Sequence, residues 1–279
     1  KLWKLVYGGL YKHNLETIIG FVGLEGKNAI ITGGSHGIGL ATAKLLASEG
    51  CNVALLSRDL KKLQKAKQQI SEFNVDCLIF QVDVLNKKQI ENSFEEIGKH
   101  WKQVHILINN VGGGGRWGID DFVKNSDTVW QEVYDKNLTA ALRYTRFAVP
   151  YMKKQQWGRV VTVTSTLGRQ AGGRAWFNVA KTAQTCLMKN LSLNKDLVRH
   201  GITFNSVSPG CIMIPNTGWE DEKEKNPEEF KNMLYDKFPL GRMGKPEEVA
   251  YAIVMLCSES ASLINGAAVA VDGGESYAF

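Results

Sequence analysis

The chain has 279 residues, of which 44% are hydrophobic and 22% charged, and its formal net charge at pH 7 is +6. This composition excludes a disordered or low-complexity chain, and the length suits one α/β domain. The basic residues are spread along the sequence without a nucleic-acid-binding motif. We therefore expect solubility and, at most, an anionic ligand, and no nucleic-acid partner.

Residues 1–26 form an apolar and aromatic N-terminal extension, interrupted by charged residues such as Lys4, Lys12 and Glu16. No apolar run in it is long enough to span a bilayer, and no small-residue cleavage site marks a signal peptide. We expect the extension to pack on the domain or on a neighbouring subunit. The alternative is a segment that lies on a membrane surface and gives peripheral membrane association.

Strands and helices alternate through the rest of the chain. We expect strands at residues 27–32, 52–56, 77–82, 106–108, 159–163, 202–207 and 267–271. We expect helices at residues 40–48, 59–70, 86–101, 127–154, 176–199 and 246–256, and an irregular substrate lid at about 211–240. The strands are apolar on both faces. The pattern predicts one domain over residues 27–279, an α/β fold with a doubly wound, Rossmann-like parallel sheet and helices on both faces.

The five cysteines have none of the CxxC or CxxxH spacings that hold metals or act in redox sites. This usage favours reduced thiols in a cytoplasmic protein. It predicts no disulfide framework and no metal site.

A glycine-rich turn follows the first expected strand and precedes a helix. Its sequence, Thr32-Gly33-Gly34-Ser35-His36-Gly37-Ile38-Gly39, has the spacing Thr-Gly-x-x-x-Gly-x-Gly. Glycines let the backbone approach a pyrophosphate, and the helix N-terminus stabilises its charge. The alternative is a tight strand-to-helix turn without a ligand.

Six further motifs follow in chain order. They are Asp83-Val84, Asn109-Asn110-Val111-Gly112, Lys136-Asn137-Leu138, Ser165 with Lys181, Asn205-Ser206-Val207-Ser208-Pro209-Gly210, and Val271-Asp272-Gly273-Gly274. With the glycine-rich turn, these motifs make residues 27–274 resemble the short-chain dehydrogenase/reductase family. The resemblance implies a doubly wound fold, a nicotinamide cofactor, oxidoreductase activity on a small-molecule substrate, and a homodimer or homotetramer.

The resemblance also assigns residues. It implies Asn137, Ser165 and Lys181 as catalytic residues: in the family the serine hydrogen-bonds the substrate oxygen, the lysine holds the nicotinamide ribose, and the asparagine supports a water chain to the lysine. The implied cofactor-binding residues are Gly33, Ser35, His36, Gly37, Ile38, Gly39, Ser57, Arg58, Asp83, Val84, Asn110, Lys181, Pro209, Gly210 and Ile212.

One position departs from the family pattern. The family has Tyr-x-x-x-Lys, in which the tyrosine exchanges a proton with the substrate oxygen, and this chain has Phe177-x-x-x-Lys181. A positioned general acid is typically worth a factor of about 10² to 10⁴ in rate. Four interpretations fit: an engineered Tyr→Phe change, a naturally divergent enzyme that protonates its substrate through water, Ser165 or the substrate itself, a reaction such as C=N or C=C reduction that needs no proton at that oxygen, or cofactor binding without turnover in a sensor or scaffold. The flanking Arg174, Trp176 and Asn178 favour natural divergence.

The end of the second expected strand indicates the cofactor. An acidic residue there would bind a ribose 2′-hydroxyl, but this chain has Ser57-Arg58. A hydroxyl and a guanidinium suit a 2′-phosphate, and His36 can add a donor. We predict NADP(H) in preference to NAD(H). The alternative for Arg58 is a solvated residue at a helix start.

The substrate pocket is expected around a four-glycine run, residues 112–115. The candidate pocket residues are Arg116, Trp117, Arg169, Trp176 and Trp219. Arg116 could meet an anionic substrate, the alternative being a surface turn, and an aromatic residue at a helix start is more often packing. At the sixth position of the family's Pro-Gly-x-x-x-Thr motif the chain has Ile214, which predicts a weaker or a rebuilt nicotinamide contact. These patterns specify no single substrate.

Overall fold

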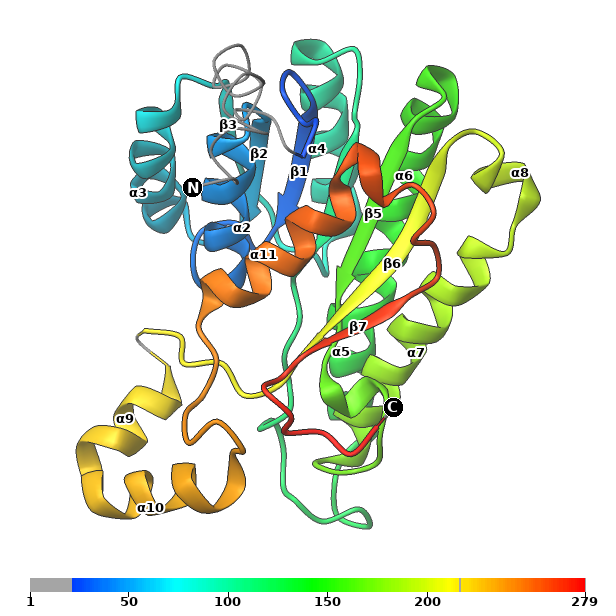
Figure 1. The fold of residues 1–279 in the computed structure, drawn as a ribbon. Helices are drawn as coiled ribbons and strands as arrows, with labels where there is room; N and C mark the ends of the chain where they lie inside the picture. Colours follow the sequence, from blue (N-terminus) through cyan, green and yellow to red (C-terminus); the bar gives the residue numbers. More distant parts are fainter. Residues whose placement is uncertain (1–21, 216, 279) are drawn as a thin grey trace, which may run out of the picture.

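The computed structural model describes residues 22–215 and 217–278 (Figure 1). The expected N-terminal extension therefore lies outside the described residues up to position 21. Its last part belongs to the folded body, because Leu24 is fully buried and Val22 packs against the same apolar cluster. Packing of the domain thus begins before residue 27.

The described residues form one seven-stranded parallel sheet with the order β3-β2-β1-β4-β5-β6-β7. The strands are β1 (Asn28–Thr32), β2 (Asn52–Ser57), β3 (Cys77–Gln81), β4 (Ile106–Asn109), β5 (Gly158–Val163), β6 (Ile202–Pro209) and β7 (Ala268–Val271). The sheet grows from β1 to one side and from β4 to the other. This reversal confirms the doubly wound fold, and it opens a crevice at the carboxyl ends of β1 and β4, where such sheets bind ligands.

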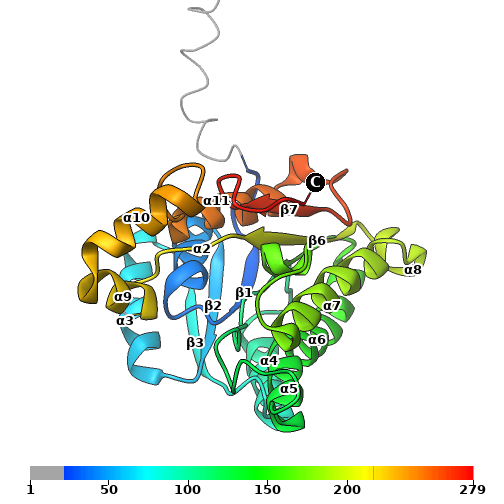
Figure 2. The same ribbon diagram turned by 90° about the horizontal axis from the view of Figure 1, so that it is seen from below.

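Two layers of helices cover the sheet (Figure 2). One face carries α2 (Gly37–Ser48), α3 (Leu60–Ile70) and α11 (Pro246–Cys257), and the other carries α4 (Lys87–His100), α6 (Ala140–Gln155) and α7 (Ala175–Ser192). Side chains alternate along β1, so Ala29 and Ile31 pack in the first apolar core and Ile30 packs in the second. Burial on both faces explains why the central strands β1, β2 and β4 are mostly apolar.

The helix expected over residues 127–154 is interrupted. Helix α5 (Asp127–Tyr134) is followed by a π-helical turn, η2 (Asp135–Thr139), before α6 begins. The wider turn lies around Asn137, whose buried side chain donates to the carbonyl oxygens of Val133 and Gly113. Asparagine side chains compete with the backbone for hydrogen bonds, and π turns often lie at functional sites.

The helix expected over residues 176–199 is also divided. Helix α7 ends at Ser192, and Asn194 caps a separate short helix, α8 (Lys195–Val198), by accepting a hydrogen bond from the backbone N–H of Asp196. A side-chain cap of this kind starts a new helix after a break in the chain.

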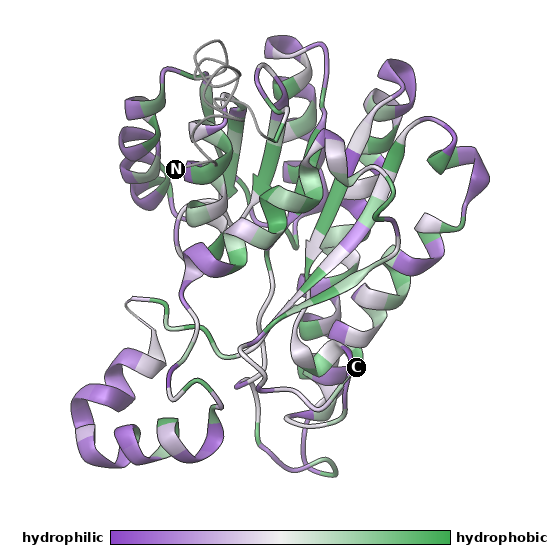
Figure 3. Cartoon of the chain, viewed as in Figure 1, coloured by the Kyte–Doolittle hydropathy of each residue, from purple (hydrophilic) through white to green (hydrophobic). Residues whose placement is uncertain are grey.

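The segment expected to be irregular contains two helices, so that part of the prediction was wrong. They are α9 (Gly218–Lys225) and α10 (Pro227–Lys237), and they lie beyond the carboxyl ends of the strands (Figure 1). Pro227 starts α10, and Glu228 and Glu229 favour its first turn. Both helices are largely hydrophilic (Figure 3), and Phe230 and Phe238 pack in a small apolar cluster.

Candidate active site

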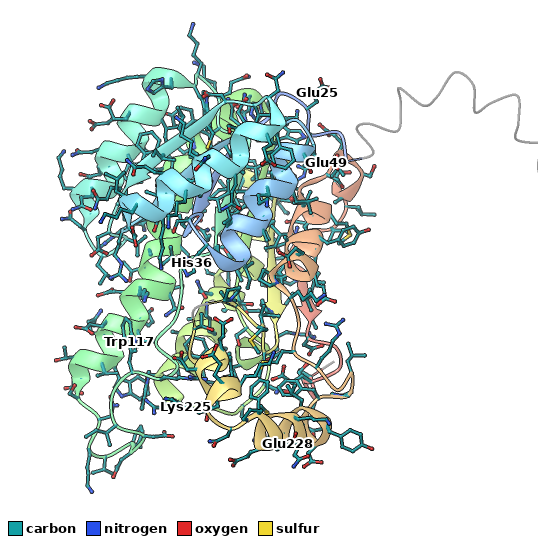
Figure 4. The ribbon with its side chains drawn as sticks, turned by 90° about the vertical axis from the view of Figure 1, so that its left-hand side faces the viewer. Glu25, His36, Glu49, Trp117, Lys225 and Glu228 are labelled. Carbon is teal, nitrogen blue, oxygen red and sulfur yellow. The ribbon has the colours of Figure 1, made fainter. Side chains whose placement is uncertain are left out.

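A cavity of about 780 Å³ opens at the carboxyl ends of the central strands. Residues that directly follow β1, β4 and β5 line it, and Thr217 and Trp219 of the α9 region cover it. In Figure 4, His36 and Trp117 lie between the end of the molecule that carries Glu25 and Glu49 and the end formed by α9 and α10. The cavity therefore lies at the reversal in strand order.

The structure brings most of the predicted site residues together in this cavity. Those that line it are Gly33, His36, Gly37, Ile38, Ser57, Arg58, Asp83, Val84, Asn110, Arg116, Trp117, Ser165, Phe177, Lys181, Pro209, Gly210, Ile212 and Trp219. Five predicted residues do not line the cavity, and they are Ser35, Gly39, Asn137, Arg169 and Trp176.

The glycine-rich turn is held tightly against its surroundings. Gly37 has a φ of +56°, a conformation that favours glycine. A Cβ atom at Gly39 would collide with the carbonyl oxygen of Gly33, so only glycine lets α2 approach the turn. The buried Ser35 hydroxyl donates to the hydroxyl of Ser57 at 2.9 Å. Gly39 and Ser35 thus shape the turn from behind the cavity.

Asn110 joins the turn to β4. Its Nδ2 donates to the carbonyl oxygen of Thr32 at 2.9 Å, and its backbone N–H donates to the Thr32 hydroxyl at 2.9 Å. These bonds connect the carboxyl ends of the two strands at which the sheet order reverses. Asn110 therefore stabilises the shape of the crevice.

Lys181 is the buried cation of the site. Its side chain is 3% exposed, and its Nζ donates to the carbonyl oxygen of Val163 at 3.1 Å and to Oε1 of Gln184 at 2.9 Å. Burial, and then the charge of Lys136, lower the pKa of Lys181 to about 7. The ammonium lies 5.7 Å from the centre of the Phe177 ring. Lysine and phenylalanine share one face of α7, as their spacing predicts.

Ser165 lies two residues after the end of β5 and lines the cavity, as Lys181 does. Its Oγ accepts a hydrogen bond from the backbone N–H of Leu167 at 3.2 Å. This contact uses a lone pair and leaves the hydroxyl proton for another acceptor. The serine can therefore donate to an oxygen atom in the cavity.

Asn137 acts from behind the four-glycine run. Its Oδ1 accepts from the backbone N–H of Gly113 at 3.2 Å, and its Nδ2 donates back to the Gly113 carbonyl oxygen at 2.8 Å. A Cβ atom at Gly112 would lie 2.7 Å from Lys181 Nζ and 2.8 Å from Asn137 Oδ1. The glycines here permit a close approach to the site, and the start of this loop is fixed to the π turn.

Two of the predicted pocket residues lie outside the cavity lining. Trp176 is 2% exposed, packs against Val133, and donates from Nε1 to the carbonyl oxygen of Gly114 at 3.1 Å. Trp176 is therefore a packing residue, as aromatic residues at helix starts often are, and it fixes the four-glycine run. Arg169 ends a 3₁₀ turn, where its backbone N–H donates to the carbonyl oxygen of Thr166.

The cavity is rich in cations. Its lysine and arginine residues are Arg58, Arg116, Lys136, Arg174 and Lys181, and its acidic residues are Asp83 and Glu275. Burial, and then the charge of Arg58, lower the pKa of Lys136, and the charge of Asp83 opposes this decrease. Cations held close together favour an anionic ligand.

Among the residues of the site that the sequence did not predict, Lys136 and Gln184 lie directly beside the catalytic candidates. Lys136 lines the cavity, with its Nζ 4.3 Å from the centre of the Trp117 ring. Its signal was its position directly before Asn137. Gln184 is fully buried and hydrogen-bonded to Lys181, and its signal was a polar residue at helical spacing among apolar ones.

Comparison with known proteins identifies the family. The family model described as Enoyl-(Acyl carrier protein) reductase matches residues 33–276. The 3-oxoacyl-[acyl-carrier-protein] reductase of Aquifex aeolicus is 33% identical over 252 residues, which are 90% of this chain and 98% of that protein. The chain belongs to the short-chain dehydrogenase/reductase family. The resemblance seen in the sequence is thereby confirmed.

Other members of the short-chain dehydrogenase/reductase family are similarly close. The D-beta-hydroxybutyrate dehydrogenase of Cupriavidus necator is 30% identical over 260 residues, 90% of this chain and 98% of that protein. The crystal structure of L-sorbose reductase from Gluconobacter frateurii, complexed with NADPH and L-sorbose, has a TM-score of 0.84 and 30% identity, and the match covers 91% of this chain and 98% of that one. These relatives are oxidoreductases, so this chain is a protein of an oxidoreductase family.

Proposed function

We propose that this protein transfers hydride between NADP(H) and a carbonyl or hydroxyl group, or a C=N or C=C bond, of a small molecule, with an acid–base site that lacks the tyrosine. The observation that carries the proposal is the buried Lys181 beside Ser165 and Phe177 in the cavity at the reversal in strand order. Asn137, Ser165 and Lys181 are the proposed catalytic residues. The second candidate is a cofactor-binding sensor or scaffold without turnover, which the missing phenol favours.

In this proposal, Lys181, Ser165 and Phe177 have separate roles. Two of the three Lys181 ammonium protons are bound by Val163 and Gln184, and the third is available for a cofactor ribose hydroxyl. The Ser165 hydroxyl donates to the substrate oxygen and positions it for hydride, which the nicotinamide supplies when bound. Phe177 provides an apolar wall without a proton. The proton must then come from water, from Ser165 or from the substrate.

The flanks of Phe177 support natural divergence over an engineered change. Arg174 donates from Nη1 to the carbonyl oxygens of Trp117 and Gly118, both at 2.8 Å, and Trp176 binds the loop at Gly114. On the other side, Asn178 donates to the carbonyl oxygens of two residues in the link after Ser165. Every one of these divergent flanking residues therefore stabilises a loop around the cavity. A single engineered change at position 177 would leave the family's usual residues on either side of it, so we infer natural divergence.

The proposed activity is tested by following NADPH oxidation with a panel of ketones, aldehydes, imines and enones. We expect oxidation with at least one class, and its loss in the Lys181→Met variant. If the native protein binds NADPH but oxidises it with no class of substrate, the sensor or scaffold interpretation replaces this one.

The cofactor preference depends on Arg58. This exposed residue lies at the edge of the cavity, next to Ser57 and near Lys136, where a 2′-phosphate would compensate the two cations. We expect Arg58→Asp to weaken NADPH binding about 10- to 100-fold, because a charged hydrogen bond is lost and a repulsive charge is added, and to change NADH binding little. Fluorescence titration of both cofactors measures this.

A charge reversal outside the cavity serves as the control. Lys65 is exposed on α3 and does not line the cavity, so Lys65→Asp should leave both affinities unchanged. Tighter binding of NADH than of NADPH by the native protein would contradict the assignment of the cofactor.

Arg116 is proposed to recognise an anionic group on the substrate. Its guanidinium lies 4.6 Å from the centre of the Trp219 ring of α9, and Trp117 lines the cavity beside it. We expect Arg116→Met to raise KM about 10- to 100-fold for carboxylate-bearing substrates and less than about threefold for neutral ones. Kinetics on matched acid and amide substrates decide this, with the exposed Lys124→Met as the control. Equal effects on both substrates would show that Arg116 only packs on Trp219.

We also propose a homodimer or homotetramer that pairs through α6 and α7, where the apolar Val179 is 49% exposed. Light scattering tests this, and a monomer would contradict it.

We propose a cytoplasmic location, with α9 and α10 acting as a substrate lid. In the described part of the chain, no helix is both long and apolar enough to cross a membrane. Liposome sedimentation with and without residues 1–21 tests the alternative of peripheral membrane association.

A further inference from the structure

Gln184 is a fully buried amide one turn beyond Lys181 on α7. Its Oε1 accepts a hydrogen bond from Lys181 Nζ at 2.9 Å, and its Nε2 donates to the carbonyl oxygen of Asn137 at 2.9 Å. The neighbouring buried positions on this face include Ala180 and Met188, so the helical pattern predicts an apolar residue at position 184. A buried amide is tolerated here because both of its ends are hydrogen-bonded.

The contacts of Gln184 determine what Lys181 can offer to a ligand. Of the three ammonium protons, one is bound by Val163 and one by Gln184, which leaves one donor for the cavity. The lysine cannot rotate this donor away without breaking a buried hydrogen bond. Lys181 therefore presents a single, directed charge.

In the described part of the chain, no acidic side chain acts on the charge of Lys181. The π turn contributes Lys136, whose charge lowers the pKa of Lys181 in addition to the larger effect of burial. Among the described residues packed around the ammonium, Phe177 of α7, Val163 of β5 and Asn137 of the π turn are uncharged. The amide oxygen of Gln184 is thus one of two neutral acceptors that favour the charged form.

We propose that Gln184 is a positioning residue for cofactor binding: its amide oxygen orients and stabilises the Lys181 ammonium, and its amide nitrogen fixes the ammonium to the π turn at Asn137. This inference rests on the proposed function, because it requires a cofactor that Lys181 anchors. An amide does not titrate, so Gln184 joins Asn137 to Lys181 without a group that carries protons. The arrangement favours a binding role for the lysine over proton transfer.

The pH dependence of NADPH binding tests this role. Fluorescence titrations of the full chain between about pH 5.5 and 9.5 should show a rising Kd in the native protein above about pH 7, since binding prefers the charged lysine. In Gln184→Leu the rise should begin about one pH unit lower, with an affinity about fivefold weaker near pH 7 and about tenfold weaker above about pH 8. In Gln184→Glu it should begin at a higher pH, because a carboxylate stabilises the ammonium more strongly.

Opposite shifts in the two variants distinguish positioning from mere space filling. Met188→Leu, at the next buried position on the same face, is the control and should follow the native profile. If Gln184→Glu does not fold, the profile of Gln184→Leu decides the question alone. Native NADPH binding with superimposable profiles in the Gln184 variants would overturn the inference. Failure of the native protein to bind NADPH would instead contradict the proposed function, and this inference with it.

Discussion

The Phe177→Tyr variant should reduce a carbonyl substrate about 10² to 10⁴ times faster than the native protein in a single turnover, because the substitution restores a positioned acid. The Phe177 ring lines the cavity, so a hydroxyl on it would meet the substrate and not the core. The Lys181 ammonium, 5.7 Å from the ring centre, would lower the pKa of the new phenol. Ser165 is already available to hold the substrate oxygen.

The appropriate measurement is a stopped-flow single turnover with NADPH already bound. Steady-state rates are less direct, because the phenol must regain its proton before each new turnover. Gln184 takes up the hydrogen bonds that join Lys181 to Asn137, and an amide does not pass a proton on, so this step could limit the steady-state rate. Phe177→Met is the matched control, since it removes the ring without adding an acid and should give no gain. If Phe177→Tyr gives no gain either, protonation does not limit the reaction, which would favour C=N or C=C reduction or cofactor binding without turnover.

The fold could be predicted because its determinants are local in the sequence. The alternation of apolar strands with amphipathic helices gives the parallel sheet, and the glycine-rich turn after β1 marks the start of the crevice. Ser57 ends β2 and Arg58 directly follows it, so their place at the cavity follows from the topology alone. Residues at the carboxyl ends of strands converge wherever the sheet brings those ends together.

The remaining features depend on contacts between distant segments. Trp176 is a residue type that often lines pockets, but its indole N–H donates to the carbonyl oxygen of Gly114, 62 positions away. This bond holds the side chain in the interior, away from the cavity. The π turn carries Asn137, whose side chain binds Gly113 of the four-glycine run, 24 positions away. Gln184 bridges to a carbonyl oxygen 47 positions away. No local pattern contains these pairings, and the helices α9 and α10 were missed because their charged residues resemble those of a polar loop.

The unfolding free energy of the native protein, compared with that of Lys181→Met, should increase with pH in the absence of cofactor. Burial, and then Lys136, lower the pKa of Lys181 from its ordinary value of 10.5 to about 7 in the folded protein. Between these values the unfolded chain binds a proton that the folded chain does not, so stability rises with pH. Each pH unit in this window contributes up to about 1.4 kcal/mol, and we expect a relative gain of about 2 kcal/mol between pH 7 and pH 9.

Urea denaturation of both proteins at about pH 7, 8 and 9 measures the difference, in which the titration of other groups largely cancels. The exposed Lys65→Met variant is the control, because a solvated lysine should show no such trend in this range. Adding NADPH should flatten the native curve, since an anionic ligand favours the ammonium and raises its pKa. Parallel stabilities of the native protein and Lys181→Met across the range would mean that the lysine stays charged throughout. In that case its burial would not govern how the site binds a cofactor.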